Sequence, residues 1–169
     1  MLPLDRLVHF QTKWLTLIGE HLQDEHGTIH EYWRIEKADS VIVLPRYRQA
    51  ILLPPPTYRP GIGQSTLDLP GGRVDRPLPE AALAVLEREL LAPAAAIAQL
   101  VPLNPAGWWV NSSFSNQKLY GWVADVSPDW PLPDALLAHP IAAYDTLLPE
   151  IHCLQCRMVL REARAQGYL

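Results

Sequence analysis

The chain has 169 residues, of which 49% are hydrophobic and 19% charged, and this composition indicates one folded globular domain with its own core. Its net charge is −4 and no run is rich in lysine or arginine, so we expect no duplex nucleic acid as a partner, because binding a duplex requires a basic surface. No apolar stretch approaches the ~18 residues of a membrane-spanning helix, so we expect no membrane partner.

The N-terminal region predicts antiparallel strands. Residues 14–22 are rich in apolar side chains, and the polar run 23–27 predicts a turn. Residues 28–36 alternate, with aromatic and β-branched side chains at period two, which is typical of a strand. Apolar side chains are frequent in both segments: Trp14, Leu15, Leu17, Ile18, Trp33 and Ile35. A hairpin this apolar is only marginally stable alone, so we expect residues 1–38 to form an extension that packs on a second copy in a homodimer.

Two short apolar runs follow and predict buried strands at 40–44 and 49–53. We expect Pro45 to end the first strand and residues 46–48 to form the hairpin loop. The proline- and glycine-rich segment 54–63 then predicts a long loop.

The second half of the chain predicts helices on either side of further strands. Pro79 can begin a helix that runs to about Leu91, and Pro93 stops it. One stripe of this helix is apolar and consists of Ala82, Val85, Leu86 and Leu90. Strands are then predicted at Ile97–Val101 and Lys118–Val126, with a polar loop between them, and a closing amphipathic helix at Leu147–Gln166 with Leu154, Val159 and Leu160 on one side. This order predicts a mixed α/β (α+β) sandwich in residues 39–169.

The segment around the predicted helix carries a recognisable motif. Residues 69–75, 79–82 and 87–93 resemble the Nudix box, including its seven residues between Glu80 and the pair Arg88-Glu89. Further segments resemble one branch of that family, the ADP-ribose pyrophosphatases and related ADP-sugar hydrolases: 27–33, 39–43, 57–61, 68–75 and 107–120. The resemblance implies a Nudix α/β/α sandwich with an N-terminal antiparallel extension that crosses to a second subunit. It also implies hydrolysis of a nucleoside diphosphate linked to a group X.

The motif departs from the family's pattern at the metal site. Seven residues separate Gly72 from Glu80 where the family has five, and Ala95 replaces a glycine. Ala92 and Pro93 stand where the family places two metal-binding glutamates, so most of the metal site is missing. The resemblance implies Mg²⁺ or Mn²⁺ if the protein is active, and the alternative is that it needs no metal.

The resemblance also assigns candidate site residues. Glu89, Arg88 and Glu80 are the catalytic candidates, and Glu89 and Glu80 are the candidate metal ligands. The substrate-binding candidates are Arg59, Tyr32, Trp33, Gly71 and Gly72, with an adenine stacked on the aromatic pair. For the general base the nearest candidates are Asp125 and Asp129, and their surroundings do not match the family.

Each of these residues also has a structural reading. Glu80 and Glu87 can be solvated helix charges, Glu89 can pair with an arginine, and Arg88 can hold the loop against the helix through hydrogen bonds. Gly71 and Gly72 can serve a positive φ angle or a close approach of a strand.

Two further pairs of residues leave open alternatives. Cys153 and Cys156, beside His152, suit a metal or redox role, but buried packing thiols are the more common case. Trp108 and Trp109 can face a ligand or pack in the core, and because adjacent side chains point different ways, one of them should be partly exposed.

Three functions remain open from the sequence. The chain could be a Nudix hydrolase with a depleted acidic site, a nucleotide-binding or protein-interaction module that does not hydrolyse, or a structural dimeric module. The ligand expected for the first two is a nucleotide-type small molecule. The start of the chain is charged too early for a signal peptide, and two cysteines suit a reducing compartment, so we expect a cytoplasmic protein.

Overall fold

The computed structural model describes residues 1–169, which divide into two units. The N-terminal unit comprises residues 1–39 and 108–118, and the core unit comprises residues 40–107 and 119–169. No helix in either unit has the length and apolar character needed to cross a membrane.

The N-terminal unit is built on a three-stranded antiparallel sheet of order β1-β2-β3. Its strands are β1 (Leu2–Gln11), β2 (Thr16–Gln23) and β3 (Ile29–Glu36). The predicted strand at 28–36 is confirmed. β1 has no clear alternation in the sequence, because register shifts between Pro3 and Asp5 and between Arg6 and Val8 interrupt its period of two. The segment 108–118 lies on β3 through a backbone hydrogen bond from Ile35 N to Phe114 O, at 2.8 Å, and contains β10 (Trp108–Trp109).

The core unit is organised around a mixed sheet in which β4 is central. Its strands are β4 (Ser40–Tyr47), β5 (Ala50–Leu53), β8 (Gly71–Arg73), β9 (Ile97–Pro102), β11 (Lys118–Val126) and β12 (Leu137–Pro140). β11 pairs with β4 in parallel, while the β4–β5, β5–β12, β4–β8 and β9–β11 pairings are antiparallel. A separate short hairpin consists of β6 (Thr57–Arg59), which lies inside the segment 54–63 predicted as a loop, and β7 (Gln64–Thr66), which follows that segment.

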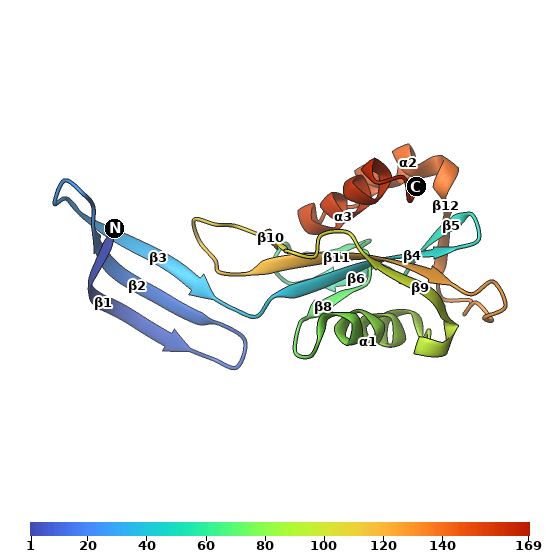
Figure 1. Ribbon diagram of the computed structural model, residues 1–169, viewed down its shortest axis with the longest axis horizontal. Helices are drawn as coiled ribbons and strands as arrows, with labels where there is room; N and C mark the ends of the chain where they lie inside the picture. The colour runs from blue at the N-terminus through green and yellow to red at the C-terminus, as the bar shows by residue number, and fades with distance from the viewer. The chain divides into compact units, whose positions relative to one another are not determined.

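Helices cover both faces of this sheet (Figure 1). α1 (Leu78–Leu90) lies on one face, and α2 (Tyr144–Glu150) and α3 (Leu154–Ala165) lie on the other. Two short 3₁₀ turns, at Ala94–Ala96 and Ile141–Ala143, complete the helical segments. The stripe predicted for the first helix is buried, with every one of its four residues in the core. The core unit is therefore an α/β/α sandwich, which confirms the predicted fold class.

Two predicted element boundaries were wrong. Pro45 does not end a strand, because β4 continues to Tyr47. On one edge of β4 the residues up to Ile42 pair with β8 and those from Arg46 pair with β5, so Pro45 lies between these two ladders and its missing N–H interrupts neither.

The closing helix is also two helices rather than one. Pro149 lies near the end of α2, and Ile151 has extended backbone, is fully buried and forms a β-bridge with Leu67. α3 begins only after this bridge. Leu154, predicted on the inner face, lies at the start of α3 and is 75% exposed, while Val159 and Leu160 are buried as expected.

Candidate functional site

The core unit contains a cavity of about 420 Å³ beside the box loop. Its walls come from the start of β4, the β6–β7 hairpin, the loop before β8, the end of α1 and the start of α3. The lining residues that bear on chemistry are Arg59, Asp68, Gly71, Gly72, Glu89, His152, Cys153, Gln155 and Cys156. A volume of this size lies within the range of about 300–1,000 Å³ typical of small-molecule sites.

An ion pair occupies the hairpin side of the cavity. Arg59 Nε donates to Asp68 Oδ2 at 2.8 Å, and the Thr66 hydroxyl donates to the same oxygen at 2.9 Å. Asp68 is only 7% exposed, whereas about half of the Arg59 side chain is exposed, at 48%. The other carboxylate oxygen, Asp68 Oδ1, is buried and accepts no hydrogen bond.

The Nudix-like segment is held together by Arg88. Its Nη2 atom donates to Gly71 O at 2.7 Å and lies 2.9 Å from Glu89 Oε1. This hydrogen bond attaches the loop to the helix, as the structural reading of Arg88 expects, and Glu89 pairs with an arginine, as its structural reading expects.

Neither glycine has a positive φ angle. Both lie where neighbouring side chains pack so closely on the backbone that a Cβ atom would be crowded. A Cβ atom on Gly72 would lie 2.9 Å from Val85 Cγ2 and 3.1 Å from Arg88 Nη2. On Gly71 it would lie 3.2 Å from Ile42 Cγ1. A larger residue at Gly72 would therefore push the box loop away from α1.

The carboxylates of the helix do not gather at the cavity. Glu89 lines it, whereas Glu80 and Glu87 are exposed and are not among its lining residues. At about 100° per residue, Glu87 and Glu89 lie about 200° apart around the helix, so they point to nearly opposite sides. Ala92 is fully buried in the hydrophobic core, and Pro93 precedes the first 3₁₀ turn.

Mg²⁺ therefore does not fit these residues. A hard divalent cation needs several oxygen ligands, and the cavity offers two carboxylates, Glu89 and Asp68, each of which already pairs with an arginine. No hydrolytic step through Mg²⁺ follows from this arrangement.

Two thiols lie at the other side of the cavity. Cys156 is buried in the first turn of α3, and Cys153 immediately precedes that helix and is half-buried. The Sγ atoms and a carboxylate oxygen of Asp68 all lie within 4.8 Å of one another. The interaction with the Cys156 thiol lowers the pKa of Cys153, and the same interaction together with burial raises the pKa of Cys156.

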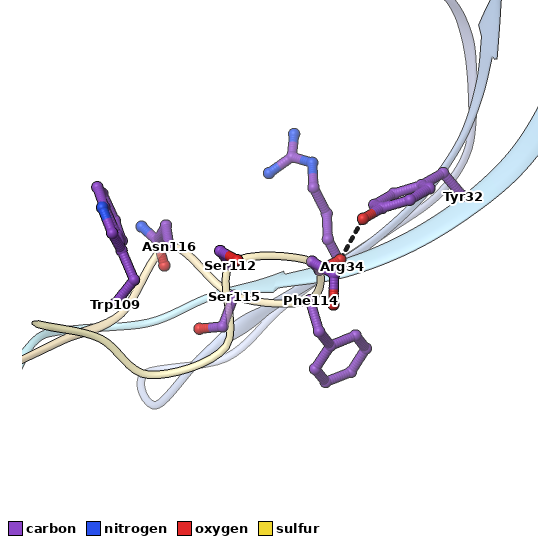
Figure 2. Close-up of a pocket in the computed structure, with 8 residues that line it drawn as sticks. Tyr32, Arg34, Trp109, Ser112, Phe114, Ser115 and Asn116 are labelled. Carbon is purple, nitrogen blue, oxygen red and sulfur yellow. Dashed lines mark hydrogen bonds between the residues drawn. The ribbon is translucent and has the colours of Figure 1, made fainter. Parts of the chain in front are cut away.

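The N-terminal unit has a pocket of its own, of about 330 Å³ (Figure 2). Tyr32, Arg34, Trp109 and residues 112–116 line it, and the Tyr32 hydroxyl donates to Ser113 O. Arg34 is held by two carboxylates, with Nε 2.7 Å from Glu20 and Nη1 2.6 Å from Glu36. The Arg34 charge is therefore already paired with carboxylates. The aromatic side chains of the pocket suit a planar ring more than a phosphate group.

The predicted aromatic pair lies on two faces of β3. Tyr32 lines the pocket, whereas Trp33 covers Gly19, where an added Cβ would lie 2.9 Å from the indole ring. Adjacent strand residues point to opposite faces, so one planar base cannot stack on both rings. Of the two neighbouring tryptophans in the loop, Trp109 is exposed and lines this pocket, with Lys118 Nζ 4.7 Å from its ring centre. The prediction that one of them is partly exposed is thereby confirmed.

The structure thus brings together some predicted site residues and not others. The core cavity contains Arg59, Gly71, Gly72 and Glu89, while Tyr32 and Trp33 belong to the other unit. Asp125 forms an ion pair with Arg46 at 2.7 Å and, like the exposed Asp129, does not line the cavity. The roles assigned to Glu80, Glu89 and Arg59 in catalysis or binding stay predictions.

Sequence reasoning missed the contribution of Asp68 to the cavity. The residue stands between two leucines in a segment that was noted only for its resemblance, and nothing in the sequence showed that its carboxylate is buried. The Cys-x-x-Cys spacing was the one signal that pointed to the same side of the cavity.

Comparisons with known proteins identify the fold. No protein-family profile and no curated protein sequence matches the chain. Among solved structures, an ADP compounds hydrolase superposes with a TM-score of 0.74 at 20% sequence identity, covering 100% of this chain and 98% of that chain. At this identity the likeness shows the fold alone. The chain has the fold of that hydrolase over its full length, and the α/β/α sandwich of its core unit agrees with the Nudix-like fold that the sequence predicts.

Proposed function

We propose that the protein binds an ADP-type nucleoside diphosphate compound in the core cavity and hydrolyses it with Mg²⁺ only slowly or not at all. The observation that carries this proposal is the set of residues that line the cavity. It retains the box loop and an arginine, Arg59, but only one carboxylate of the helix, Glu89.

The binding part rests on the cavity and the fold together. Arginine suits phosphate because its planar guanidinium donates several hydrogen bonds, and about half of the Arg59 side chain is exposed, at 48%. A solved structure with the same fold over the whole chain is that of an ADP compounds hydrolase, which supports an ADP-type ligand.

The weak-hydrolysis part rests on the carboxylates. Metal ions contribute several kcal/mol of charge stabilisation in such reactions, and each 1.36 kcal/mol lost slows the reaction about tenfold. Ala92 and Pro93 have no side-chain donor atom, and Glu80 does not reach the cavity wall. The remaining site therefore lacks the groups that would hold the cation.

A second candidate is a protein-interaction module. The N-terminal unit exposes a group of large apolar side chains, and such surfaces commonly mark interfaces. They are Leu2, Leu4, Phe10, Trp14, Ile29, Trp33, Trp109 and Phe114.

Calorimetric titration with ADP-ribose, in the presence and absence of Mg²⁺, tests the binding part. We expect one ligand per chain and an affinity that changes little when Mg²⁺ is added, because the cavity holds no carboxylate cluster for that ion. Absence of heat with ADP-ribose and with ADP-sugars would favour the interaction module. A strict requirement for Mg²⁺ would show that the carboxylates do form a metal site.

A further inference from the structure

One wall of the core cavity brings two thiols and a carboxylate together from distant parts of the sequence. Asp68 follows β7, whereas Cys153 and Cys156 lie at the start of α3. Each residue offers one donor atom, and the three atoms lie within 4.8 Å of one another.

One oxygen of the Asp68 carboxylate has no hydrogen-bond partner. Oδ2 accepts hydrogen bonds from Arg59 and Thr66, which fix the group, whereas Oδ1 is buried and accepts none. Asp68 is 7% exposed, and a buried unpaired carboxylate oxygen is costly unless another group binds it. Metal-binding carboxylates are usually held in this way, by hydrogen bonds through the oxygen that does not bind the metal.

The thiols complete the arrangement. Cys153 immediately precedes α3 and Cys156 lies in its first turn, and both sulfur atoms lie within 4.8 Å of a carboxylate oxygen of Asp68. Cys156 is buried, and Cys153 lines the cavity, which leaves a route by which an ion can enter.

We propose that Asp68, Cys153 and Cys156 bind a zinc-type divalent cation. Two thiolates and one carboxylate match the preferences of Zn²⁺, whereas Mg²⁺ avoids sulfur ligands. Zn–S bonds of about 2.3 Å and Zn–O bonds of about 2.0–2.2 Å at tetrahedral angles place the donors about 3.5–3.8 Å apart, so donors within 4.8 Å of one another need to approach by about 1 Å or less. The fourth position opens to the cavity, where water would complete the tetrahedron. His152 lies outside the donor group and contacts Gln64 at 3.3 Å.

Cobalt titration of the reduced, metal-free protein tests this site, and the absence of nucleotide keeps the result independent of the proposed function. Co²⁺ is the probe because its thiolate complexes absorb in the near ultraviolet. We expect one Co²⁺ per chain, displacement by Zn²⁺ but not by Mg²⁺, and protection of both thiols from a thiol-alkylating reagent by Zn²⁺.

Variants identify the ligands. Cys153→Ser and Cys156→Ser should each weaken Co²⁺ binding and reduce the thiolate absorption band, because each removes one of the two thiolates. Asp68→Asn should weaken Co²⁺ binding at least about tenfold, because the loss of a group that only supports a ligand already costs about tenfold to a hundredfold. Gln155→Ala is the matched control, because Gln155 lines the same wall without belonging to the donor group, and it should bind Co²⁺ as the wild type does.

Three results would overturn the proposal: no Co²⁺ binding by the reduced protein, wild-type affinity in Asp68→Asn, or wild-type binding in either cysteine variant. Circular dichroism verifies that each variant is folded. If Asp68→Asn is unfolded, the two cysteine variants and the thiol-protection measurement decide the question on their own.

Discussion

At the scale of single residues, the clearest constraint is the close packing of Gly72 on α1. A Cβ atom there would meet Val85 at 2.9 Å and the Arg88 guanidinium at 3.1 Å, so the Arg88 hydrogen bond to Gly71 O would also be disturbed. We expect Gly72→Ala to lower the free energy of unfolding by about 1–3 kcal/mol, the usual cost of overpacking. Urea denaturation measures this change.

Gly61 provides the control for that substitution. An added Cβ there would meet no atom within 4 Å, and its φ angle is not positive. Gly61→Ala should therefore change the unfolding free energy by less than about 0.5 kcal/mol. Equal effects of the two substitutions would show that the close approach at Gly72 is not what stabilises the loop.

Arg59 is the residue on which ligand binding should depend most. If its guanidinium binds a phosphate, Arg59→Ala removes charge-assisted hydrogen bonds worth about 1.5–3 kcal/mol, which corresponds to a loss of about tenfold to a hundredfold in affinity for ADP-ribose. Calorimetry measures the loss, with the exposed Arg161→Ala on α3 as control. Unchanged affinity in Arg59→Ala would place the ligand elsewhere.

The sequence predicted residue roles best where a residue contacts the main chain of a nearby segment. Arg88 and the two glycines keep loop and helix together. The sequence predicted this role for Arg88 and left a positive φ angle or a close approach open for the glycines. The burial of Asp68 was not predictable, because it depends on α3, which approaches from the far end of the chain. Short-range pattern carries no information about such long-range contacts.

At the scale of elements, α3 offers a direct test of its orientation. Leu160 is 0% exposed and Leu154 is 75% exposed on the same helix. We expect Leu160→Ala to cost about 2–5 kcal/mol of unfolding free energy, because it leaves a cavity in the core. Leu154→Ala should be nearly neutral, and thermal or urea denaturation of the two variants compares them. A large loss of unfolding free energy in Leu154→Ala would show that Leu154 is buried.

Periodic elements were predicted well and irregular ones were not. The strand at Lys118–Val126 has the predicted bounds, and α1 differs by one residue at each end from the predicted Pro79–Leu91. The prediction of a single closing helix was wrong because the buried residue Ile151 forms a β-bridge. This tertiary contact overrides the helical pattern of the sequence. The predicted strand end at Pro45 was wrong for a similar reason. A proline fits inside a strand where its missing N–H faces no ladder partner, and this depends on tertiary pairing.

At the scale of the whole molecule, the surface of the N-terminal unit predicts a homodimer. Strand β1 exposes Leu2, Leu4 and Phe10, and Trp14 follows it. Burial of these side chains against a second copy would remove them from water, and each fully buried large apolar side chain contributes about 1.5–3 kcal/mol. Light scattering at micromolar concentration should give the mass of a dimer.

A substitution on that surface locates the interface. Phe10→Asp should shift the protein toward the monomer, whereas His26→Ala, in the exposed turn between β2 and β3, should leave the dimer intact. A monomeric wild-type protein would contradict the prediction at once, and a dimer unaffected by Phe10→Asp would place the interface on another surface.

We propose that the core cavity binds a ligand but lacks the carboxylate cluster that Mg²⁺-dependent hydrolysis needs. Turnover of ADP-ribose and ADP-sugars with Mg²⁺ and with Mn²⁺ tests it most directly. The geometry predicts a kcat several orders of magnitude below the ordinary enzyme value of roughly 10 s⁻¹, because Glu89 is the only helix carboxylate at the cavity. A kcat near that ordinary value would contradict the account and would mean that Glu80, Glu87 and Glu89 together rebuild a metal site.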